Sequence, residues 1–399
     1  METDVIIVGA GPAGLCAARS LSGCGLRIVV VEQQSVAAIG DPRYDGREIA
    51  LTQKSVRILK HLGLWDRIEP EERSPLRDAR VFDGASTAAL EIGHELGRHP
   101  ELGWLVSNHR IREAAWRAVQ HAIAANADIS IVAEETVKAV ETDDAAARVT
   151  LASGQTLTGK LLIAADSRFS ATRRMMGIGA DLHDFGKSML VCRMTHEKPH
   201  HHAAWEWFGY GQTLALLPTN PDPASGAHRS SVVVTLRGNE ADELAHVDPA
   251  RFDADIERRF DGRLGRMKLA STRHVYPLVA VYPRRFVGRR FAAIGDAAVG
   301  MHPVTAHGFN LGLLSVDKLS AEVVAAHTGG RDIGGASLLN RYESHHYRAS
   351  RPLYLATRFI TELYTRGSPP AKLMRRVILH AAGHFTPFRK AVAIALSDR

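Results

Sequence analysis

Apolar runs and helical patterns alternate from the start of the chain. Residues 3–33, TDVIIVGAGPAGLCAARSLSGCGLRIVVVEQ, contain an apolar run, a glycine turn, a helix of small residues and a second apolar run that ends in Glu32. Buried parallel strands read as continuous apolar runs, and a helix between two of them forms a βαβ unit. The pattern therefore predicts a parallel sheet near the N-terminus.

Two amphipathic helices and a strand-rich stretch are predicted next. Apolar residues recur at helical spacing in residues 53–65, directly after Thr52, a residue type that caps helices. Residues 108–126 show the same spacing. Residues 129–166 read as short strands that end in the apolar run KLLIAAD.

The middle of the chain changes character. Strand-forming residues separated by Pro, Gly and Asp fill residues 186–237, which predicts a mostly antiparallel sheet. The βαβ pattern returns at Phe286, so the first domain is interrupted in sequence. We predict an α/β fold with three parts: a discontinuous Rossmann-like nucleotide domain (residues 1–72, 97–178 and 284–339), a mostly antiparallel β-sheet substrate domain (73–96 and 179–283) and a helical C-terminal segment (340–399).

Composition narrows the class of protein. A chain of 399 residues is long enough for two domains, and 45% apolar with 23% charged residues is typical of globular proteins. No apolar run approaches the roughly 20 residues that span a bilayer. The first strand pattern begins almost at Met1, so we expect no signal peptide. Three cysteines without CxxC spacing predict reduced thiols in a cytoplasmic protein.

The net charge of +7 is concentrated at the C-terminal end. Residues 340–399 contain eleven Lys or Arg and only three Asp or Glu, whereas the rest of the chain is nearly balanced. A basic segment of this kind binds anionic membrane surfaces or nucleic acid, or forms a solvated helical face. Charge alone leaves these interpretations open.

The opening turn predicts dinucleotide binding. Gly9, Gly11 and Gly14 follow the G-x-G-x-x-G pattern, with Ala13 inside it, between a strand and a helix. Such glycines permit a tight turn and let a pyrophosphate approach the helix N-terminus. Glu32 ends the second strand, a position where a carboxylate accepts hydrogen bonds from the ribose hydroxyls of a dinucleotide. The pattern disfavours a 2′-phosphate at this site and leaves NAD and FAD open.

Two later motifs share the strand-then-acid arrangement. LLIAADSRFSATRRMMGI (161–178) places Asp166 at a strand end, and AAIGDAAVGMHPVTAHGFNLG (292–312) places Asp296 after another strand. Together with the glycine turn, in this order, they resemble the group A flavoprotein monooxygenases, the para-hydroxybenzoate hydroxylase family. DGREIALTQKSVRILKHLGLW (45–65) and ALLP (215–218) look most like the ubiquinone-biosynthesis ring hydroxylases, and HPVTAHGFNLGL (302–313) looks most like their 5-demethoxyubiquinol hydroxylase branch.

The resemblance implies an activity and its partners. FAD would be reduced by NADPH or NADH, oxygen would add at flavin C4a, and the hydroperoxide would hydroxylate the ring of a polyprenylated phenol or quinol. A polyprenyl substrate must leave a membrane, so the basic segment gains a membrane-binding interpretation at the inner face of the cytoplasmic membrane. Other ubiquinone-biosynthesis enzymes would be partners, and nucleic acid would not.

The resemblance also implies roles for individual residues. Asp296 would bind the ribityl chain, and the helix beginning near Gly308 would direct its N–H groups at the flavin. Further cofactor-binding positions, carried over from the family or from the glycine turn, are Gly9, Gly11, Ala13, Gly14, Glu32, Arg47, Arg110, Val137, Asp166, Phe309 and Asn310. Pro303, Thr305 and His307 would lie along the reacting ring.

Two positions depart from the family pattern. Ser167 follows Asp166 where relatives have Gly, so the backbone turn and the role of Asp166 are both in question. His307 stands where many relatives have Gln. Its imidazole would either hydrogen-bond the substrate phenol or the flavin, or pack at the start of the helix.

Two further stretches have structural and functional interpretations. The run HHH at 200–202 resembles metal ligands, but adjacent histidines rarely converge on one ion, so we expect no metal. Trp205 and Trp207 share one strand face and either pack in a core or line an apolar pocket.

Other functions stay open for the chain as a whole. These are hydroxylation of a soluble aromatic compound, reduction of isoprenoid chains by a flavin, and a flavin-binding scaffold role within a biosynthetic complex.

Overall fold

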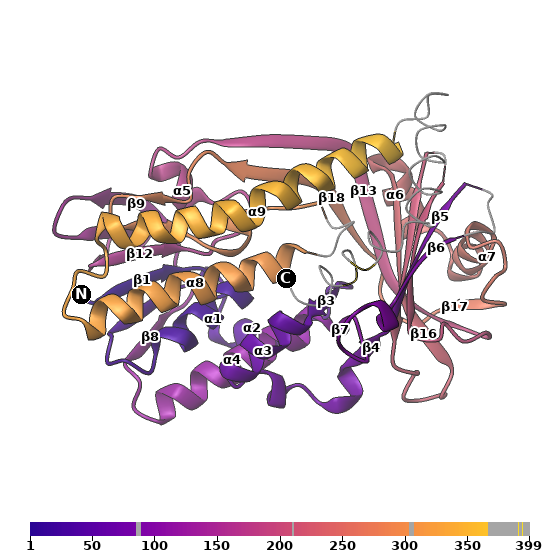
Figure 1. The fold of residues 1–399 in the computed structure, drawn as a ribbon, viewed down its shortest axis with the longest axis horizontal. Helices are drawn as coiled ribbons and strands as arrows, with labels where there is room; N and C mark the ends of the chain where they lie inside the picture. Colours follow the sequence, from indigo (N-terminus) through magenta and orange to yellow (C-terminus); the bar gives the residue numbers. More distant parts are fainter. Residues whose placement is uncertain (85–88, 210, 303–306, 366–389, 391–392, 394–399) are drawn as a thin grey trace.

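The computed structural model describes residues 1–84, 89–209, 211–302 and 307–365, with Lys390 and Ala393 (Figure 1). Its first sheet has six strands in the order β19-β20-β12-β1-β2-β8. All neighbours are parallel except β19 and β20. The strands are β1 (Val5–Val8), β2 (Ile28–Val31), β8 (Ile129–Val132), β12 (Leu161–Ala164), β19 (Val287–Gly288) and β20 (Phe291–Ala293). The predicted βαβ opening is confirmed.

Helices pack around this parallel sheet. The longer ones are α1 (Pro12–Leu21), α3 (Gln53–His61), α4 (Asn108–Ala124), α8 (Gly308–Thr328) and α9 (Ala336–Thr365), and the shorter ones are α2 (Val36–Gly40) and α5 (Ala171–Met175). The Thr52 hydroxyl accepts a hydrogen bond from Ser55 N and caps α3, as predicted. The second amphipathic pattern corresponds to α4.

The second sheet is mostly antiparallel. It runs β17-β13-β16-β15-β14-β5-β6, with β18 also paired to β13, and only β14 and β5 are parallel. The strands are β5 (Asp78–Asp83), β6 (Ala89–Gly93), β13 (Ala180–His196), β14 (Ala203–Phe208), β15 (Thr213–Thr219), β16 (His228–Arg237), β17 (Met267–Leu269) and β18 (His274–Pro283). The predicted antiparallel sheet is confirmed.

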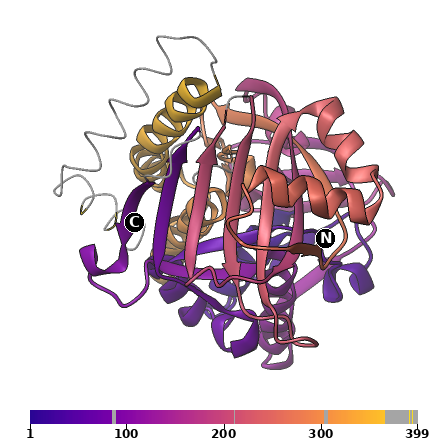
Figure 2. The ribbon, with the colours of Figure 1, turned by 90° about the vertical axis from the view of Figure 1, so that its right-hand side faces the viewer.

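One face of the second sheet forms its own core. Helices α6 (Gly238–His246) and α7 (Pro249–Arg259) lie across the strands in front of the viewer in Figure 2, away from the parallel sheet. Alternate strand residues, including Trp205, Trp207 and Phe82, pack beneath these helices with Phe252 and Ile256. Core packing is therefore the role of the two tryptophans.

Two small sheets complete the fold. One joins β3 (Glu48–Thr52), β7 (Gly103–Ser107) and β4 (Ser74–Leu76), and lies between the two large sheets in Figure 1. The other joins β9 (Val137–Thr142), β10 (Ala147–Leu151) and β11 (Thr156–Gly159). Strands of the six-stranded sheet come from the segments assigned to the nucleotide domain, and those of the eight-stranded sheet from the segments assigned to the substrate domain. The domain boundaries themselves stay a prediction.

The C-terminal segment begins within a long helix. Helix α9 extends to Thr365, and the basic stretch at 369–399 lies outside the described residues apart from Lys390 and Ala393. Ala393 is buried in a small cluster with Ile92 and Leu102. Within the described part of the chain, no helix combines the length and apolar character that crossing a membrane requires.

Candidate active site

The three sequence motifs meet at the carboxyl ends of β1, β12 and β20. Gly9 has a φ of +106°, and a Cβ there would lie 2.5 Å from the Ala165 carbonyl oxygen. Gly295 has a φ of +59°, and a Cβ there would lie 2.8 Å from the Ala13 Cβ. Only glycine allows both approaches. The turn after β1 therefore contacts the ends of both other strands.

The turn after β1 fits a pyrophosphate. Helix α1 begins at Pro12, and no side chain caps its first turn. Gly14 packs so closely that a Cβ there would lie 1.9 Å from the Gly9 carbonyl oxygen, whereas no atom lies within 4 Å of a Cβ built at Gly11. A ligand can therefore approach the backbone at Gly11. Uncapped N–H groups and the helix dipole favour an anion at this position.

Glu32 lies beside the same turn. Its carboxylate accepts hydrogen bonds from Ala10 N at 2.6 Å and from Gln34 N at 3.0 Å. The Glu135 N–H donates to the Glu32 carbonyl oxygen at 3.0 Å, so the segment that leads into Val137, the first residue of β9, is bonded to the backbone of Glu32. This arrangement fits the adenosine half of a dinucleotide.

Asp296 and Arg47 act on one another electrostatically. Asp296 is 41% exposed, and its carboxylate lies 3.5 Å from the Arg168 guanidinium. Arg47 pairs with Asp45 at 2.5 Å and lies over the Tyr276 ring, 5.5 Å from its centroid. Burial lowers the pKa of Arg47, but the charge and the hydrogen bond of Asp45, with smaller contributions from Tyr276 and Asp296, outweigh burial and raise that pKa. Two predicted cofactor residues from distant motifs therefore lie within electrostatic range of one another.

Helix α8 begins at Gly308, as predicted. His307 is its N-cap residue, and the imidazole makes no capping hydrogen bond. Phe309 is partly buried against the core around the parallel sheet. Pro303 and Thr305 lie outside the described residues. The roles of these residues toward a flavin stay predictions.

Asn310 joins α8 to β3. Its Nδ2 donates to the Ala50 carbonyl oxygen at 2.7 Å, and its Oδ1 accepts from Thr52 N at 3.1 Å. The side chain is buried, so both bonds are shielded from water. Asn310 thus positions α8 relative to the strand that follows Arg47, a role that its place in the sequence motif did not indicate.

Asp166 organises the start of α5. One carboxylate oxygen accepts from the Ser170 hydroxyl at 2.5 Å, and the other accepts from Thr172 N at 3.0 Å and from its hydroxyl at 2.9 Å. Ser167 has a φ of +85°, so it keeps the left-handed turn that glycine makes without strain. The cost for an L-residue there is about 1–2 kcal/mol.

Arg110 is held by two carboxylates. Its guanidinium lies 3.0 Å from Glu72 and 3.0 Å from Glu113. Because both terminal nitrogens have acidic partners, the structure places Arg110 in an ion-pair network, and its contact with the cofactor stays a prediction.

A buried ion pair that the sequence analysis missed joins the small β3-β7-β4 sheet to the eight-stranded sheet. Glu48 on β3 is 2% exposed and Arg193 on β13 is 14% exposed, with 2.7 Å between them. The Ser107 hydroxyl donates to the same carboxylate at 2.9 Å, and Arg193 lies 4.9 Å from the Tyr44 ring centroid. Burial raises the pKa of Tyr44 to about 12. No local signal reveals this pair, because its partners are 145 positions apart.

Glu206 is a second residue that the sequence analysis missed. It lies between Trp205 and Trp207 in β14, so its side chain points to the opposite face of the sheet from theirs. Burial raises the pKa of the Glu206 carboxyl to about 8. A single acid within an otherwise apolar strand was the available signal.

The histidine run makes protein contacts. His200 Nε2 lies 3.1 Å from the Thr219 carbonyl oxygen, and its Nδ1 accepts from His202 N at 3.0 Å. Both ring nitrogens therefore have partners. Among the described residues, the group with metal-ligand spacing is instead Asp78 with His94 and Glu95, and there His94 Nδ1 lies 3.1 Å from Asp78.

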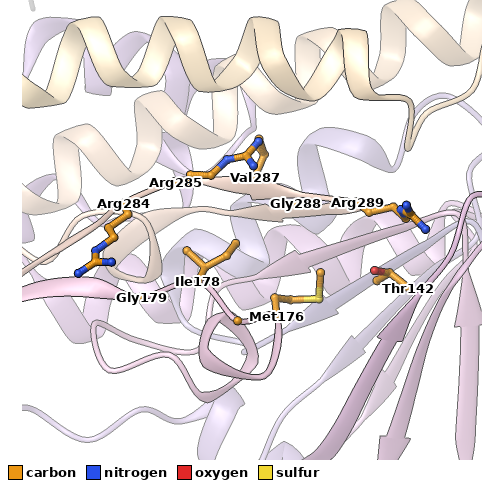
Figure 3. Close-up of a pocket in the computed structure, with 10 residues that line it drawn as sticks. Thr142, Met176, Ile178, Gly179, Arg284, Arg285, Val287, Gly288 and Arg289 are labelled. Carbon is orange, nitrogen blue, oxygen red and sulfur yellow. The ribbon is translucent and has the colours of Figure 1, made fainter.

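A pocket of about 560 Å³ lies at the start of β13, between α5 and β19 (Figure 3). Arg284, Arg285 and Arg289 line it with apolar residues that include Met176 and Ile178. Figure 3 shows the three guanidinium groups directed to different sides, so they do not converge on one anion. None of the predicted site residues lines this pocket.

Sequence comparisons agree with a flavin site. A family model described as an FAD binding domain matches residues 2–353. The ubiquinone hydroxylase UbiM of Neisseria meningitidis is 43% identical over 401 residues, covering 100% of this chain and 85% of the relative. The ubiquinone hydroxylase UbiL of Rhodospirillum rubrum is 32% identical and covers 97% of this chain and 87% of its own. The 3-demethoxyubiquinol 3-hydroxylase of Escherichia coli is 26% identical, with 95% and 94% covered.

Solved structures share the fold. PqsL of Pseudomonas aeruginosa, in complex with 2-aminobenzoylacetate, aligns with a TM-score of 0.75 at 18% identity over 94% of this chain and all of its own. The p-nitrophenol 4-monooxygenase PnpA of Pseudomonas putida aligns with a TM-score of 0.76 at 16% identity, covering 98% and 97%. At these identities the likeness concerns the fold alone.

Proposed function

Since the chain belongs to the family of FAD-binding ubiquinone hydroxylases, we propose that it hydroxylates the aromatic ring of a polyprenylated phenol or quinol in ubiquinone biosynthesis. The observation that carries this proposal is the 43% identity to a ubiquinone hydroxylase along the full length of the chain. Within this class we assign 5-demethoxyubiquinol as the substrate, because the loop at 302–313 resembles that branch.

The residues of this chain fit FAD. The turn at Gly9–Gly14 would hold the pyrophosphate. Glu32 would accept hydrogen bonds from the ribose hydroxyls, and Asp296 would accept hydrogen bonds from the hydroxyls of the ribityl chain. When bound, FAD would supply the redox chemistry, namely its own reduction by NADH or NADPH and the transfer of one oxygen atom to the substrate ring. The protein would position the ring and exclude water from the reacting centre.

Arg47 and Asp296 would mark the side of the protein on which the cofactor site opens to solvent. Both side chains are roughly two-fifths exposed, although they lie beside buried strands. The start of α8 is tied to β3 through Asn310, so its N–H groups and positive dipole end are held in one direction. Such fixed donors stabilise negative charge without reorganisation.

Isotope labelling tests the proposed reaction. The protein with bound FAD would be incubated with NADPH, heavy oxygen gas and lipid extract rich in demethoxyubiquinol, and the quinones analysed by mass spectrometry. One heavy oxygen atom in the ring supports the proposal. Consumption of NADPH without label would favour a soluble aromatic substrate. Neither label nor NADPH loss would favour a scaffold role and would contradict the proposed enzyme.

We also propose peripheral binding to the inner face of the cytoplasmic membrane, where a polyprenyl substrate resides and other enzymes of the pathway would act. In the sequence of residues 369–399, Leu373 and Val377 have the spacing of one face of a helix, with Arg375 and Arg376 between them, so we expect a basic amphipathic helix there. Reversing both arginines to Glu should reduce sedimentation with anionic vesicles and leave binding to neutral vesicles unchanged. Equal sedimentation of variant and parent would contradict membrane binding through this segment.

The charge-reversal variant is preferable to deletion. Removing residues 369–399 should also reduce vesicle binding, but it takes away Ala393, which is fully buried against Ile92 and Leu102. A deletion phenotype would therefore combine lost membrane contact with lost packing.

A further inference from the structure

Helix α9 runs along the outside of the molecule and exposes apolar side chains to water (Figure 1). Three of the large apolar side chains that the described part of the chain exposes belong to this helix. They are Tyr347, Leu355 and Phe359, which are 48%, 47% and 56% exposed. Single exposed apolar residues are common on soluble proteins, whereas a group of them on one element marks a contact surface.

The same part of α9 is basic. The sequence of residues 344–359 contains no acid and three arginines, which are Arg348, Arg351 and Arg358. Glu343, the acid that directly precedes this stretch, accepts a hydrogen bond from Phe286 N at 2.8 Å. That carboxylate is therefore directed at the protein, and the exposed stretch combines positive charge with apolar surface.

These side chains lie on one side of the helix. At 3.6 residues per turn, Arg348, Leu355 and Phe359 fall on one stripe along the helix axis, and Tyr347 lies on its flank with the other two arginines. The stretch from Tyr347 to Phe359 is about 18 Å long. The outer face of α9 is the surface formed by Tyr347, Arg348, Arg351, Leu355, Arg358 and Phe359.

The opposite face of α9 fixes the helix to the protein. The Tyr342 hydroxyl donates to the Ala293 carbonyl oxygen at 2.6 Å, and the Tyr282 and Ser350 hydroxyls share a hydrogen bond of 3.0 Å. The Tyr354 ring packs on the Tyr282 ring, with 4.6 Å between the ring centroids. These contacts hold α9 in one orientation, so its outer face is a preformed surface.

One acid lies at the edge of this surface. Asp181 on β13 is exposed, and it acts on the same tyrosine as two of the arginines. Burial raises the pKa of the Tyr354 hydroxyl, the charge of Arg358 lowers it, the charge of Asp181 raises it and the charge of Arg351 lowers it. Two positive charges thus meet one negative charge at this edge, and Arg348 adds a third positive charge to the outer face.

Charge decides which partner fits the outer face of α9. A second copy of the chain on a two-fold axis would place these arginines against their own copies, which like charges disfavour. The segment at 369–399 is also basic, and Ala393 within it packs against Ile92 and Leu102 instead. An anionic lipid bilayer offers negative headgroups to the arginines and an apolar boundary layer to Leu355 and Phe359.

We propose that the outer face of α9 binds the surface of an anionic lipid membrane. The helix axis lies parallel to the membrane, Leu355 and Phe359 enter the boundary between headgroups and acyl chains, and the arginines pair with headgroup phosphates. The choice of partner rests on the proposed function, whose substrate resides in a membrane. The surface itself is distinct from the segment at 369–399 and consists of described residues.

Sedimentation with lipid vesicles tests this surface in the full chain with bound FAD. The apolar variant is Leu355→Gln with Phe359→Gln, and the charge variant is Arg348→Gln with Arg358→Gln. Each is compared with the parent on vesicles of phosphatidylglycerol with phosphatidylcholine, and on vesicles of phosphatidylcholine alone.

Matched controls make the same changes on other surfaces. Val36→Gln alters an exposed apolar residue of α2, which is 49% exposed. Arg258→Gln with Arg266→Gln removes two arginines whose side chains are 74% and 80% exposed. Both controls should bind vesicles within about twofold of the parent, because these residues lie outside the proposed surface.

The two variants should differ in their lipid dependence. The charge variant should bind anionic vesicles about 25-fold more weakly, at about fivefold per arginine, and should bind neutral vesicles as the parent does. The apolar variant should lose about 25-fold on both kinds of vesicle, since each of its two side chains has about half its surface still to bury.

A fluorescent label reports the contact directly. Phe359→Cys is introduced together with Cys24→Ser, because Cys16 and Cys192 are buried and Cys24 is half-buried. A solvent-sensitive dye on the new cysteine should shift its emission to shorter wavelength when anionic vesicles are added, as the dye leaves water. The same dye at Arg258→Cys should show no shift.

The outcomes separate this surface from the other proposals. If both α9 variants bind anionic vesicles within twofold of the parent and the dye at residue 359 does not shift, the surface is wrong, whereas a loss on reversal of Arg375 and Arg376 would still support the C-terminal segment. A parent dimer that the apolar variant dissociates, or DNA binding that the charge variant loses, with vesicle binding unchanged, would also overturn the proposal.

Vesicle binding is measured without turnover, so it is independent of the labelling experiment. If the parent labels no ring while both α9 variants lose vesicle binding, the hydroxylase proposal fails and the membrane surface stands. If the parent labels the ring but does not sediment with anionic vesicles, the hydroxylase stands and the membrane surface is wrong.

Discussion

Replacing Arg193 by methionine tests how the eight-stranded sheet is joined to the small β3-β7-β4 sheet. The guanidinium lies 2.7 Å from Glu48, whose side chain is 2% exposed, and Met leaves that carboxylate buried with the Ser107 hydroxyl as its one partner among the described residues. Removing one member of a buried ion pair typically costs 3–5 kcal/mol. We expect a loss of about that size, against a total stability of roughly 5–15 kcal/mol for a folded domain.

Two comparisons make the interpretation specific. Arg266→Met removes a surface pair with Glu197, in which the side chains are 80% and 48% exposed, so it should leave stability nearly unchanged. The double variant Glu48→Leu with Arg193→Met removes both buried charges and should recover most of the loss, because no unpaired charge stays behind.

Urea unfolding followed by tryptophan fluorescence measures all four proteins. Three of the tryptophans report on different sheets: Trp104 on β7, and Trp205 and Trp207 on β14. If Arg193→Met lies within about 1 kcal/mol of the parent, the pair is not desolvated as the structure indicates. If the double variant is as unstable as the single one, lost packing explains the effect and the charge argument is refuted.

Three further predictions concern single residues. Asp296→Ala should weaken FAD binding by roughly tenfold, as expected for one lost hydrogen-bonding partner. The control is Asp242→Ala at an exposed position of α6, which should keep full flavin on gel filtration. If Asp296→Ala also keeps full flavin, this role for Asp296 is excluded. Ser167→Gly should stabilise the fold by about 1 kcal/mol because it relieves the left-handed backbone, and an unchanged urea midpoint would show that no strain is present. His346 is fully buried, neither of its ring nitrogens has a hydrogen-bond partner among the residues that the structure describes, and burial lowers its pKa to about 4. Its folded-state pKa lies below the unfolded value near 6.5, so stability should be complete above pH 6.5 and fall by about 3 kcal/mol as the pH drops toward 4. The same titration of His346→Phe should lack this fall, and parallel curves for both proteins would contradict the assignment.

Local patterns along the chain were sufficient for much of the fold and for the nucleotide turn. The continuous apolar runs of β1 and β2, the helical spacing of α3 and the Thr52 cap all depend on residues close in sequence. The family resemblance is confirmed by the matched family and the ubiquinone hydroxylase relatives. These features were accessible because hydrogen bonding within helices and turns, and the burial of one face, impose a short period on the sequence.

Contacts across the fold decided the rest. Asp166 and Asn310 belong to motifs, yet the structure uses Asp166 to start α5 and Asn310 to tie α8 to β3. Glu48 and Arg193 form one buried pair between the small β3-β7-β4 sheet and the eight-stranded sheet, and Glu206 faces away from the tryptophans that surround it in sequence. Register and sheet packing set the burial of each charge, and the energy of a charge depends on its surroundings in space. The sequence alone therefore determined which local elements form, whereas the tertiary structure decided which polar side chains meet and which are removed from water.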